Sequence, residues 1–296
     1  MVDHAGATRL AEASDVVETA GGWLAEPQPQ DLVLTLLADN VRRRLDLVWS
    51  GGLVQILELF GFSIGASRVA FSRLARRRLI ARVKEGRQVY YQLTERAERV
   101  LSEGDERIFG FGRQQLDPST VTIVWHNLPE DRRLERGRLA RRLRFLGFGS
   151  PQDGTWVAVG KRDVQALRLI DELDVRGFAT VLCAQPAGGS DLSALVTGTW
   201  DVEGLETLYT RFVAMFGGVD PEEVTGCDAF RLRTQVIHNF RQFVALDPEL
   251  DGVLGPHHED RHRAIELFHH LYAGLAPAAL AYFDQVAGGH RPGEDG

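Results

Sequence analysis

Arginine recurs with helical spacing in residues 63–80, and the apolar side chains of this segment follow the same period. On a helix the apolar residues share one side, while Arg68, Ser72, Arg73 and Arg76 lie on the opposite side. Guanidinium groups pair with the edge of guanine and with phosphate oxygens. These residues therefore predict a helix that binds nucleic acid, and a solvated amphipathic helix is the simpler alternative.

A basic hairpin is expected directly after this helix. Residues 81–93 alternate apolar and polar side chains around a turn that contains Gly86, as a half-buried pair of strands does. Arg82, Lys84 and Arg87 cluster near that turn. A basic helix followed by a basic hairpin is typical of a winged helix-turn-helix, and it indicates binding to double-stranded DNA more strongly than the helix does alone.

The predicted DNA contacts differ in role. Base edges are expected to meet Arg68, Ser72 and Arg73, and phosphates are expected to meet Arg76, Arg77, Lys84 and Arg87. The arginines at 42–44 end the first predicted helix, where they could contact phosphate or form a solvated helix end that suits the helix dipole. The full predicted set is Arg42, Arg43, Arg44, Ser67, Arg68, Ser72, Arg73, Arg76, Arg77, Arg82, Lys84 and Arg87.

The charge distribution separates this segment from the rest of the chain. Residues 42–99 hold 13 basic and 5 acidic side chains, a balance of +8, in a chain whose net charge is -7. The remaining residues therefore carry -15. One basic, phosphate-facing module joined to acidic modules that repel DNA is the expected organisation.

Caps and periodicity place the elements that position these residues. Asp31 is expected to cap the first helix, and Ser63 and Thr94 are expected to cap two later helices, the last of which runs to about residue 102. A short β-prone segment covers 45–49, and a further helix covers 53–60.

Beyond an expected linker at 103–118, strands and helices alternate. Strands are predicted at 121–125, 154–159 and 179–184, separated by helices at 131–146 and 163–174. This order is typical of a small ferredoxin-like α+β domain. The seven arginines of the first of these helices are interpreted as a solvated or dimer-facing surface rather than a second DNA surface, because acidic residues lie nearby.

Helical patterning then continues, with aromatic residues at core spacing in 203–216, 227–245 and 260–287. The predicted fold is therefore α+β and multidomain. Its predicted segments are a flexible arm at 1–29, a winged-helix DNA-binding domain at 30–104, a ferredoxin-like middle domain at 119–186 and an α-helical C-terminal domain at 190–287.

Histidines near residue 260 offer a candidate metal site. His258, His262 and His269, with Glu266, lie on one side if a single helix spans them. The order typical of zinc hydrolases is absent, so an exposed polar helix face is the alternative. The sequence also lacks a serine nucleophile elbow, a phosphate-binding loop and a dinucleotide-binding glycine motif. No catalytic residue and no cofactor is therefore predicted.

Compartment signals are few. Cys183 and Cys227 form no disulfide framework or paired-cysteine motif, which fits a reducing cytoplasm. The first residues lack the basic start and apolar run of a signal peptide, and no stretch approaches the ~18 apolar residues of a membrane span. A cytoplasmic protein without membrane contact is expected.

Five segments in order, at 32–39, 71–77, 86–96, 143–149 and 236–250, carry a family resemblance. In them the chain resembles the PaaX family, bacterial repressors of phenylacetate-degradation genes. The resemblance implies a homodimeric repressor that an aryl-acetyl-CoA thioester releases from its operator. It also implies a middle domain similar to the small ferredoxin-like endonucleases of CRISPR systems.

Two positions depart from the family pattern. Arg78 stands where the family usually has a helix-ending glycine, so the path into the first hairpin strand could differ. Asn127 stands where the first middle strand usually ends in aspartate, which removes a carboxylate that a nuclease-like metal site needs. Nuclease activity in the middle domain is therefore not expected.

An anionic effector of the kind that the resemblance implies could meet Arg231, Arg233, His238 and Arg241, with ordinary salt bridges as the alternative. The leading hypothesis is a ligand-responsive dimeric repressor that binds a palindromic operator. A metal-dependent hydrolase or nuclease and a protein-interaction adaptor built on a winged-helix scaffold are the rival hypotheses.

Overall fold

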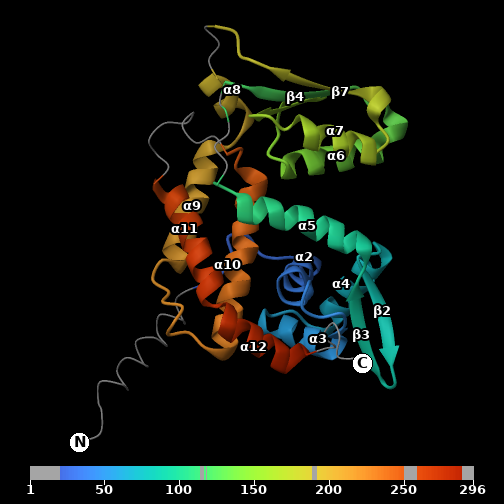
Figure 1. The fold of residues 1–296 in the computed structure, drawn as a ribbon, viewed down its shortest axis with the longest axis vertical. Coiled ribbons are helices and arrows are strands. Elements are labelled where there is room, and N and C mark those ends of the chain that lie inside the picture. The colour runs from blue at the N-terminus through green and yellow to red at the C-terminus, as the bar shows by residue number, and fades with distance from the viewer. Residues whose placement is uncertain (1–20, 114–116, 118, 189–191, 250–258, 289–296) are drawn as a thin grey trace, which may run out of the picture. The chain divides into compact units, whose positions relative to one another are not determined.

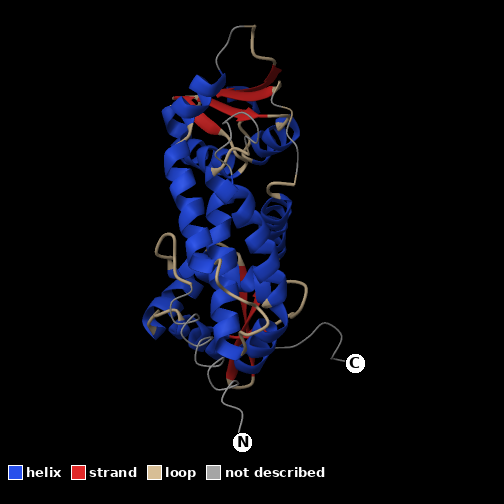
Figure 2. Ribbon diagram, turned by 90° about the vertical axis from the view of Figure 1, so that its left-hand side faces the viewer, coloured by secondary structure: helices blue, strands red, loops and turns tan. Residues whose placement is uncertain are grey.

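The structure is a computed structural model, and it describes residues 21–113, 117, 119–188, 192–249 and 259–288. Helices and two small antiparallel sheets confirm the predicted α+β class (Figures 1 and 2). In the described part of the chain, no helix is both long and apolar enough to cross a lipid bilayer.

The chain forms two compact units. Among the described residues, the first unit contains those within 21–107, 211–240 and 266–288. The second unit contains the described residues within 108–210 and 241–265. The predicted limits of three successive domains stay a prediction, because the units combine segments that are distant in the sequence.

The N-terminal part of the first unit holds the basic segment. Its elements are α2 (Pro29–Leu36), the π-helical turn η1 (Leu37–Val41), β1 (Val48–Trp49), α3 (Ser50–Leu59), α4 (Ile64–Arg76), β2 (Ile80–Glu85), β3 (Gln88–Leu93) and α5 (Glu95–Gly110). The three strands form one sheet in the order β1-β3-β2. Helix α5 continues through residues that were expected to begin a linker, so that prediction is wrong for 103–110.

Side-chain caps fix two helix starts, and a proline favours a third. Ser63 Oγ accepts from the Ala66 amide at 3.2 Å, and Thr94 Oγ1 accepts from the Ala97 amide at 3.2 Å, which confirms both predicted caps. The predicted Asp31 cap is wrong. Helix α2 begins two residues earlier, at Pro29, where a missing amide hydrogen costs nothing because first-turn amides lack helical partners.

Residues before α2 belong to the predicted arm, yet the described ones are anchored. The Leu24 amide donates to Asn239 Oδ1 at 2.9 Å, and Asn239 Nδ2 donates to the Gly22 carbonyl at 2.9 Å. The Trp23 ring packs edge-on against His238, with ring centroids 5.3 Å apart. Residues 22–24 are therefore fixed, which corrects the prediction that the arm is flexible throughout.

Apolar side chains from the N-terminal and C-terminal parts of the described chain together form the core of the first unit. Leu36, Ile56 and Leu74, from α2, α3 and α4, are fully buried in one cluster. The same cluster includes Phe230 of α10 (Gly226–Leu246) and Phe283 of α12 (Ala276–Ala287). The C-terminal helices therefore complete the core that supports the basic segment.

The second unit contains a four-stranded sheet in the order β5-β6-β4-β7. Its elements are β4 (Val121–His126), η2 (Glu130–Arg132), α6 (Arg133–Phe145), β5 (Gly149–Gln152), β6 (Thr155–Val159), α7 (Asp163–Glu172), η3 (Arg176–Phe178) and β7 (Ala179–Ala184). Helices α6 and α7 cover one face of the sheet (Figure 1). The prediction missed β5, a four-residue edge strand with little apolar signal.

The remaining described helices are α8 (Leu192–Thr199), α9 (Val202–Phe216), α10, α11 (Glu259–Gly274) and α12. Helix α8 was not predicted. The single helix expected at 260–287 is two helices, because the chain breaks at Leu275 and Pro277 stands in the first turn of α12. Proline is well tolerated there but not in a helix interior.

The exit from α4 follows a Schellman motif. The Leu79 amide donates to the Leu74 carbonyl at 3.0 Å, and the Arg78 amide donates to the Ala75 carbonyl at 2.9 Å. Arg78 has a φ of 56°, the left-handed conformation that glycine adopts without steric cost. The departure from the family pattern at this position therefore changes the residue but keeps a glycine-like backbone.

We expect Arg78→Gly to raise the free energy of unfolding by about 1 kcal/mol, because glycine removes the clash of a left-handed L-residue. Arg77→Gly is the matched control, since Arg77 has a φ of -76° and gains nothing from glycine. Urea denaturation of both variants measures the effect. Equal destabilisation by the two substitutions would show that Arg78 is not strained.

Gly52 allows α3 to pack against α12 in the first unit. A Cβ added at Gly52 would lie 2.4 Å from the Ala287 Cα and 2.4 Å from the Val286 carbonyl oxygen. Both are backbone atoms, which cannot rotate away. We expect Gly52→Ala to destabilise the chain by about 1–3 kcal/mol, the usual cost of overpacking.

The control for this change is Gly104→Ala on α5. An added Cβ there meets nothing within 4 Å, and alanine favours the helix, so stability should rise by up to about 1 kcal/mol. Thermal and urea unfolding of the two variants measure the difference. A Gly52→Ala protein as stable as the wild type would contradict the close packing.

Candidate nucleic-acid interface

Helix α4 buries one face and exposes the other. Phe71, Leu74, Ala70 and Ser67 are buried. The exposed residues of its polar face include Arg68, Ser72, Arg73 and Arg76. The prediction that these arginines lie on the side of α4 opposite its apolar residues is therefore confirmed. This side is basic and exposed to solvent.

Ser67 is the exception among the predicted contacts on α4. Its side chain is fully buried, and its Oγ donates to the Ser63 carbonyl at 3.1 Å. A base edge cannot reach this hydroxyl without displacing the helix from its own core. Ser67 is therefore a poor candidate for the predicted DNA contact, and its observed hydrogen bond lies within the fold.

The hairpin of β2 and β3 carries the second group of predicted residues. Arg82, Lys84 and Arg87 are all exposed. The strands pair from Ile80 with Leu93 to Glu85 with Gln88, which leaves a two-residue turn. Its first residue, Gly86, has a φ of 58°, as the first position of a tight hairpin turn requires.

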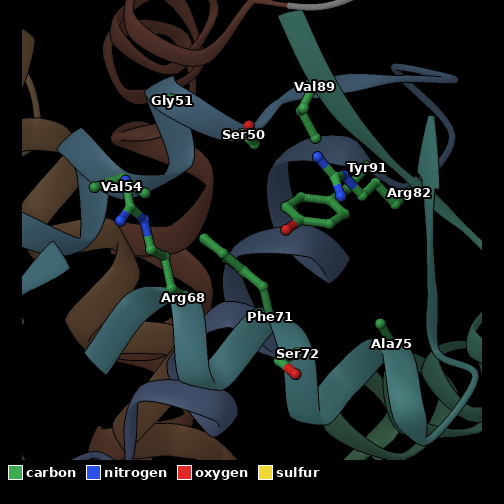
Figure 3. A pocket seen from close by; sticks show the side chains of 10 residues that line it. All are labelled: Ser50, Gly51, Val54, Arg68, Phe71, Ser72, Ala75, Arg82, Val89 and Tyr91. Carbon is green, nitrogen blue, oxygen red and sulfur yellow. The ribbon is translucent and has the colours of Figure 1, made fainter. Parts of the chain in front are cut away.

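A hollow of about 610 Å³ joins α4 to the hairpin (Figure 3). Arg68 and Ser72 of α4 and Arg82 of β2 line it, and Figure 3 places the two arginines on different sides of it. The Phe71 and Tyr91 rings lie with their centroids 5.0 Å apart and form part of its wall. Burial raises the pKa of Tyr91, and the nearby Arg82 charge opposes this. Basic side chains of the helix and of the hairpin, Arg68 and Arg82, thus both border this hollow.

The arginine triplet after α2 has three different environments. Arg42 is buried, its Nε donates to Glu98 at 2.9 Å, and its guanidinium also binds Asp105. Its Nη2 donates to Ser102 Oγ at 2.9 Å. These contacts leave Arg42 unable to reach a phosphate and also exclude a solvated helix end at this residue.

The other two arginines of the triplet differ from Arg42. Arg44 Nη2 donates to both carboxylate oxygens of Asp284, at 2.9 and 2.8 Å, and is partly buried. Arg43 is exposed and has a φ of 62°. Of the three, Arg43 is the residue that the structure places where a phosphate could reach it.

Arg233, a predicted effector contact, belongs to a buried network of the first unit. Its guanidinium binds the Asp39 carboxylate, and its Nε donates to the Tyr272 carbonyl at 3.1 Å. The guanidinium carbon also lies 4.0 Å from the centre of the Tyr272 ring. The Tyr272 hydroxyl donates to Asp39 Oδ1 at 2.5 Å. Burial raises the pKa of Asp39 despite these partners.

The other effector candidates are also placed. His238 is buried, and its Nδ1 lies 2.9 Å from Thr35 Oγ1, within hydrogen-bond distance. Arg231 is exposed and pairs with Asp228 at 3.5 Å. Arg241 is partly exposed and belongs to the second unit. The effector site stays a prediction, for which the internal contacts make Arg233 and His238 poor candidates, and Arg231 also forms an ion pair of the kind that was the alternative.

The histidine site has no support in the described structure. His258 lies outside the described residues. His262 is exposed on α11 and His269 is half-buried on the same helix. Within the described ranges, no group of three His, Cys, Asp or Glu side chains could hold a metal ion.

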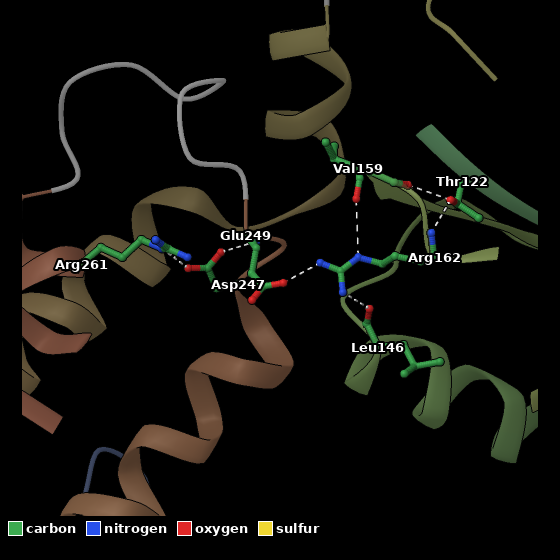
Figure 4. A network of polar contacts seen from close by, with 8 residues as sticks. Thr122, Leu146, Val159, Arg162, Asp247, Glu249 and Arg261 are labelled. Atoms are coloured by element: carbon green, nitrogen blue, oxygen red, sulfur yellow. Dashed lines mark hydrogen bonds and ion pairs between the residues drawn. The ribbon is translucent and has the colours of Figure 1, made fainter. Parts of the chain in front are cut away.

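A polar network of the second unit fixes the segment that follows α10 (Figure 4). Arg162 Nη2 donates to Glu249 at 2.6 Å, and its Nη1 donates to the Leu146 carbonyl at 3.1 Å. Asp247 Oδ2 accepts from Arg261 Nε and from the Tyr209 hydroxyl, both at 2.6 Å. Burial and the Asp247 charge raise the pKa of Tyr209.

Sequence reasoning used residues 246–250 as a family signature and assigned them no role. In the structure, Asp247 and Glu249 hold this backbone in place, and the Glu249 amide donates to Asp247 Oδ1 at 2.6 Å. Glu249 has a φ of 60°, a strained conformation that these contacts must offset. No role was predicted for Arg162 from the sequence, because its acidic partner, Glu249, is 87 residues away in the chain.

The Asp39 network predicts a measurable pH dependence. Tyr272→Phe removes a hydrogen bond to a charged group and should lower the free energy of unfolding at neutral pH by about 1.5–3 kcal/mol. Burial and the Asp39 carboxylate raise the pKa of Tyr272 above its ordinary 10.0. The folded chain therefore keeps a proton that the unfolded chain loses, so this stabilisation is complete below about pH 10 and is lost as the pH rises further.

Urea denaturation of the wild type and Tyr272→Phe at about pH 7, 10 and 11.5 tests this. The difference in stability should shrink by about 1.4 kcal/mol for each pH unit above about pH 10. Other titrating groups are common to both proteins and cancel in the comparison. A difference that stays constant across this range would contradict the buried environment of the Tyr272 hydroxyl.

Three family models match successive segments of the chain. The model described as PaaX-like protein matches residues 28–97, and the PaaX protein central Cas2-like domain matches residues 121–196. The PaaX-like protein C-terminal domain matches residues 200–285. The three matches stand in the order of the chain and cover most of its described residues.

Two individual proteins are similar to this chain. The transcriptional repressor PaaX of Escherichia coli (strain K12) is 24% identical over 263 residues, which cover 86% of this chain and 82% of that protein. The solved structure of the uncharacterized protein Rv0674 from Mycobacterium tuberculosis covers 87% of this chain and 99% of its own, with a TM-score of 0.52. At 18% identity, the second likeness shows a shared fold alone. Because three successive family models together match well over half of the chain, it belongs to the PaaX family.

Proposed function

We propose that this chain is a sequence-specific DNA-binding transcriptional repressor with a winged helix-turn-helix. The exposed basic face of α4, next to a hairpin whose basic residues are also exposed, is the observation that carries the proposal. The order α3, α4, β2 and β3 matches that motif, in which the second helix enters the major groove. The printed name of the Escherichia coli relative, a transcriptional repressor, supports the same function.

The middle of the chain supports a ferredoxin-like assignment. Two helices pack on one face of an antiparallel sheet, and the strands follow the order β5-β6-β4-β7. A βαββαβ chain with its first and third strands in the centre of the sheet has this arrangement. The match to a central Cas2-like domain of the same family agrees with it.

The proposed contacts are the predicted ones that remain exposed. Arg68, Ser72 and Arg73 project from the first turns and middle of α4 and are assigned to base edges. The residues assigned to phosphate are Arg43, Arg76, Arg77, Arg82, Lys84 and Arg87. A homodimer would place two copies of α4 in successive major grooves of a palindromic operator.

We propose that the effector is an acyl-CoA thioester, whose binding releases the repressor from its operator, as the family resemblance implies. Arg233 and His238 are committed to contacts inside the first unit, so they are poor candidates for binding it. Arg231 and Arg241 remain the candidates of the original set. The proposal is of a binding protein, and it involves no catalytic step.

Fluorescence anisotropy with the chain and the promoter nearest its gene tests the proposal. Arg68→Ala should weaken binding to the operator by about 1–3 kcal/mol and relax its sequence preference. Lys84→Ala should weaken binding to operator and random DNA alike and reduce the salt slope by about one. Arg176→Ala is the control, because Arg176 is an exposed arginine of the second unit that pairs with Asp171.

Three results would count against the proposal. Absence of salt-dependent binding to any duplex would overturn the function. Equal losses on operator and random DNA for both Arg68→Ala and Lys84→Ala would overturn the assignment of roles. An equal loss for Arg176→Ala would show that binding follows net charge and not the surface formed by α4 and the hairpin.

A further inference from the structure

Val69 is an apolar side chain at the middle of the basic face of α4. It is 51% exposed, although most large apolar side chains of the first unit are buried. Helical geometry turns each residue by about 100°, which places Val69 within about 40° of the direction opposite the buried face. Gly65, Arg68, Ser72 and Arg73 surround it, and all four are exposed.

Small neighbours allow this short side chain to approach a binding partner. Valine extends little beyond the helix backbone, so it can touch a groove floor only if the helix comes close. A Cβ added at Gly65, four residues earlier, would meet only Ser63 Oγ at 3.8 Å, so the space above it is open. Ser72, three residues later, is also small. The first two turns of α4 therefore admit the close approach that Val69 needs.

The folded chain gains little from Val69. The side chain is not part of the apolar core of the first unit, and β-branched residues are weaker helix formers than the long straight ones. Its hydrophobic surface is thus still available to be removed from water when a partner binds. An isolated apolar group inside a basic surface fits a partner that is anionic overall but carries a small apolar group at the point of contact.

We propose that Val69 contacts the C5-methyl group of a thymine in each half-site of the operator. This inference rests on the proposed function and deepens it. Among the groups that bases present in the major groove, the thymine methyl is the apolar one. Arg68 and Arg73 flank Val69 in the helix. They are five residues apart, which is a rise of about 7.5 Å along the helix axis, or roughly two base-pair steps of DNA. The thymine therefore lies within about two base pairs of the guanines that these arginines read.

The test begins with the operator sequence that the full-length chain selects from a pool of random duplexes. Each thymine of a half-site is then replaced by deoxyuridine, which removes the methyl group and keeps every hydrogen bond. We expect one such position to weaken binding by about fourfold, the effect of losing one buried methyl group. Replacement in both half-sites should weaken binding by about sixteenfold if the two contacts are independent.

Variants of the protein identify the side chain responsible. Val69→Ala should bind the thymine and deoxyuridine duplexes equally, with an affinity close to that of the wild type on deoxyuridine. Val100→Ala is the matched control, because Val100 is 44% exposed on α5, outside the basic helix. It should keep the full dependence on the methyl group. Val69→Ile should retain it as well.

The outcomes separate this inference from the proposed function. A chain that selects no duplex contradicts the proposed function itself. Selective binding that no deoxyuridine replacement weakens overturns the thymine contact and leaves the function in place. A methyl dependence that persists in Val69→Ala also overturns the inference, and would assign the contact to another side chain such as Ile64, which is 46% exposed.

Discussion

The buried ion pair of Asp39 and Arg233 is the interaction on which the first unit depends. Both side chains are almost completely inaccessible to solvent, so each charge would be costly to bury without the other. Tyr272 completes the site by donating its hydroxyl to Asp39 and accepting from Arg233 through its carbonyl. A helical turn near the N-terminal end of the described chain is thereby fixed to α10 and α11.

Two further charged residues of the same short segment also form ion pairs with distant helices. Arg42 binds carboxylates of α5, and Arg44 binds Asp284 of α12. Residues 39–44 thus form ion pairs with three helices, α10, α5 and α12, and the hydrogen bond from Tyr272 adds a contact with α11. Helix α2, which leads into this segment, packs against α4. The position of the basic helix therefore depends on contacts made by the C-terminal part of the chain.

Local signals made the basic surface predictable from the sequence. Ser63 and Thr94 cap their helices with side chains three residues from the amides they bind, and the arginine spacing of α4 needs no distant information. The role of Arg42 could not be read in this way, because its partners Glu98 and Asp105 are 56 and 63 residues away. Arg233 and Asp39 are 194 residues apart, so an arginine that looked available for a ligand is an internal contact. The edge strand β5 lacked the apolar alternation from which strands are predicted.

The contact of Gly52 with Ala287 has a consequence for synthesis of the protein. These residues are 235 positions apart, so a ribosome that adds about 5–20 residues per second needs roughly 10–50 s to make the second after the first. During that interval the segment that contains α4 has no Phe283 or Ala287 to close its core. The apolar core that supports α4 therefore stays incomplete until α12, the last helix of the described chain, has left the ribosome.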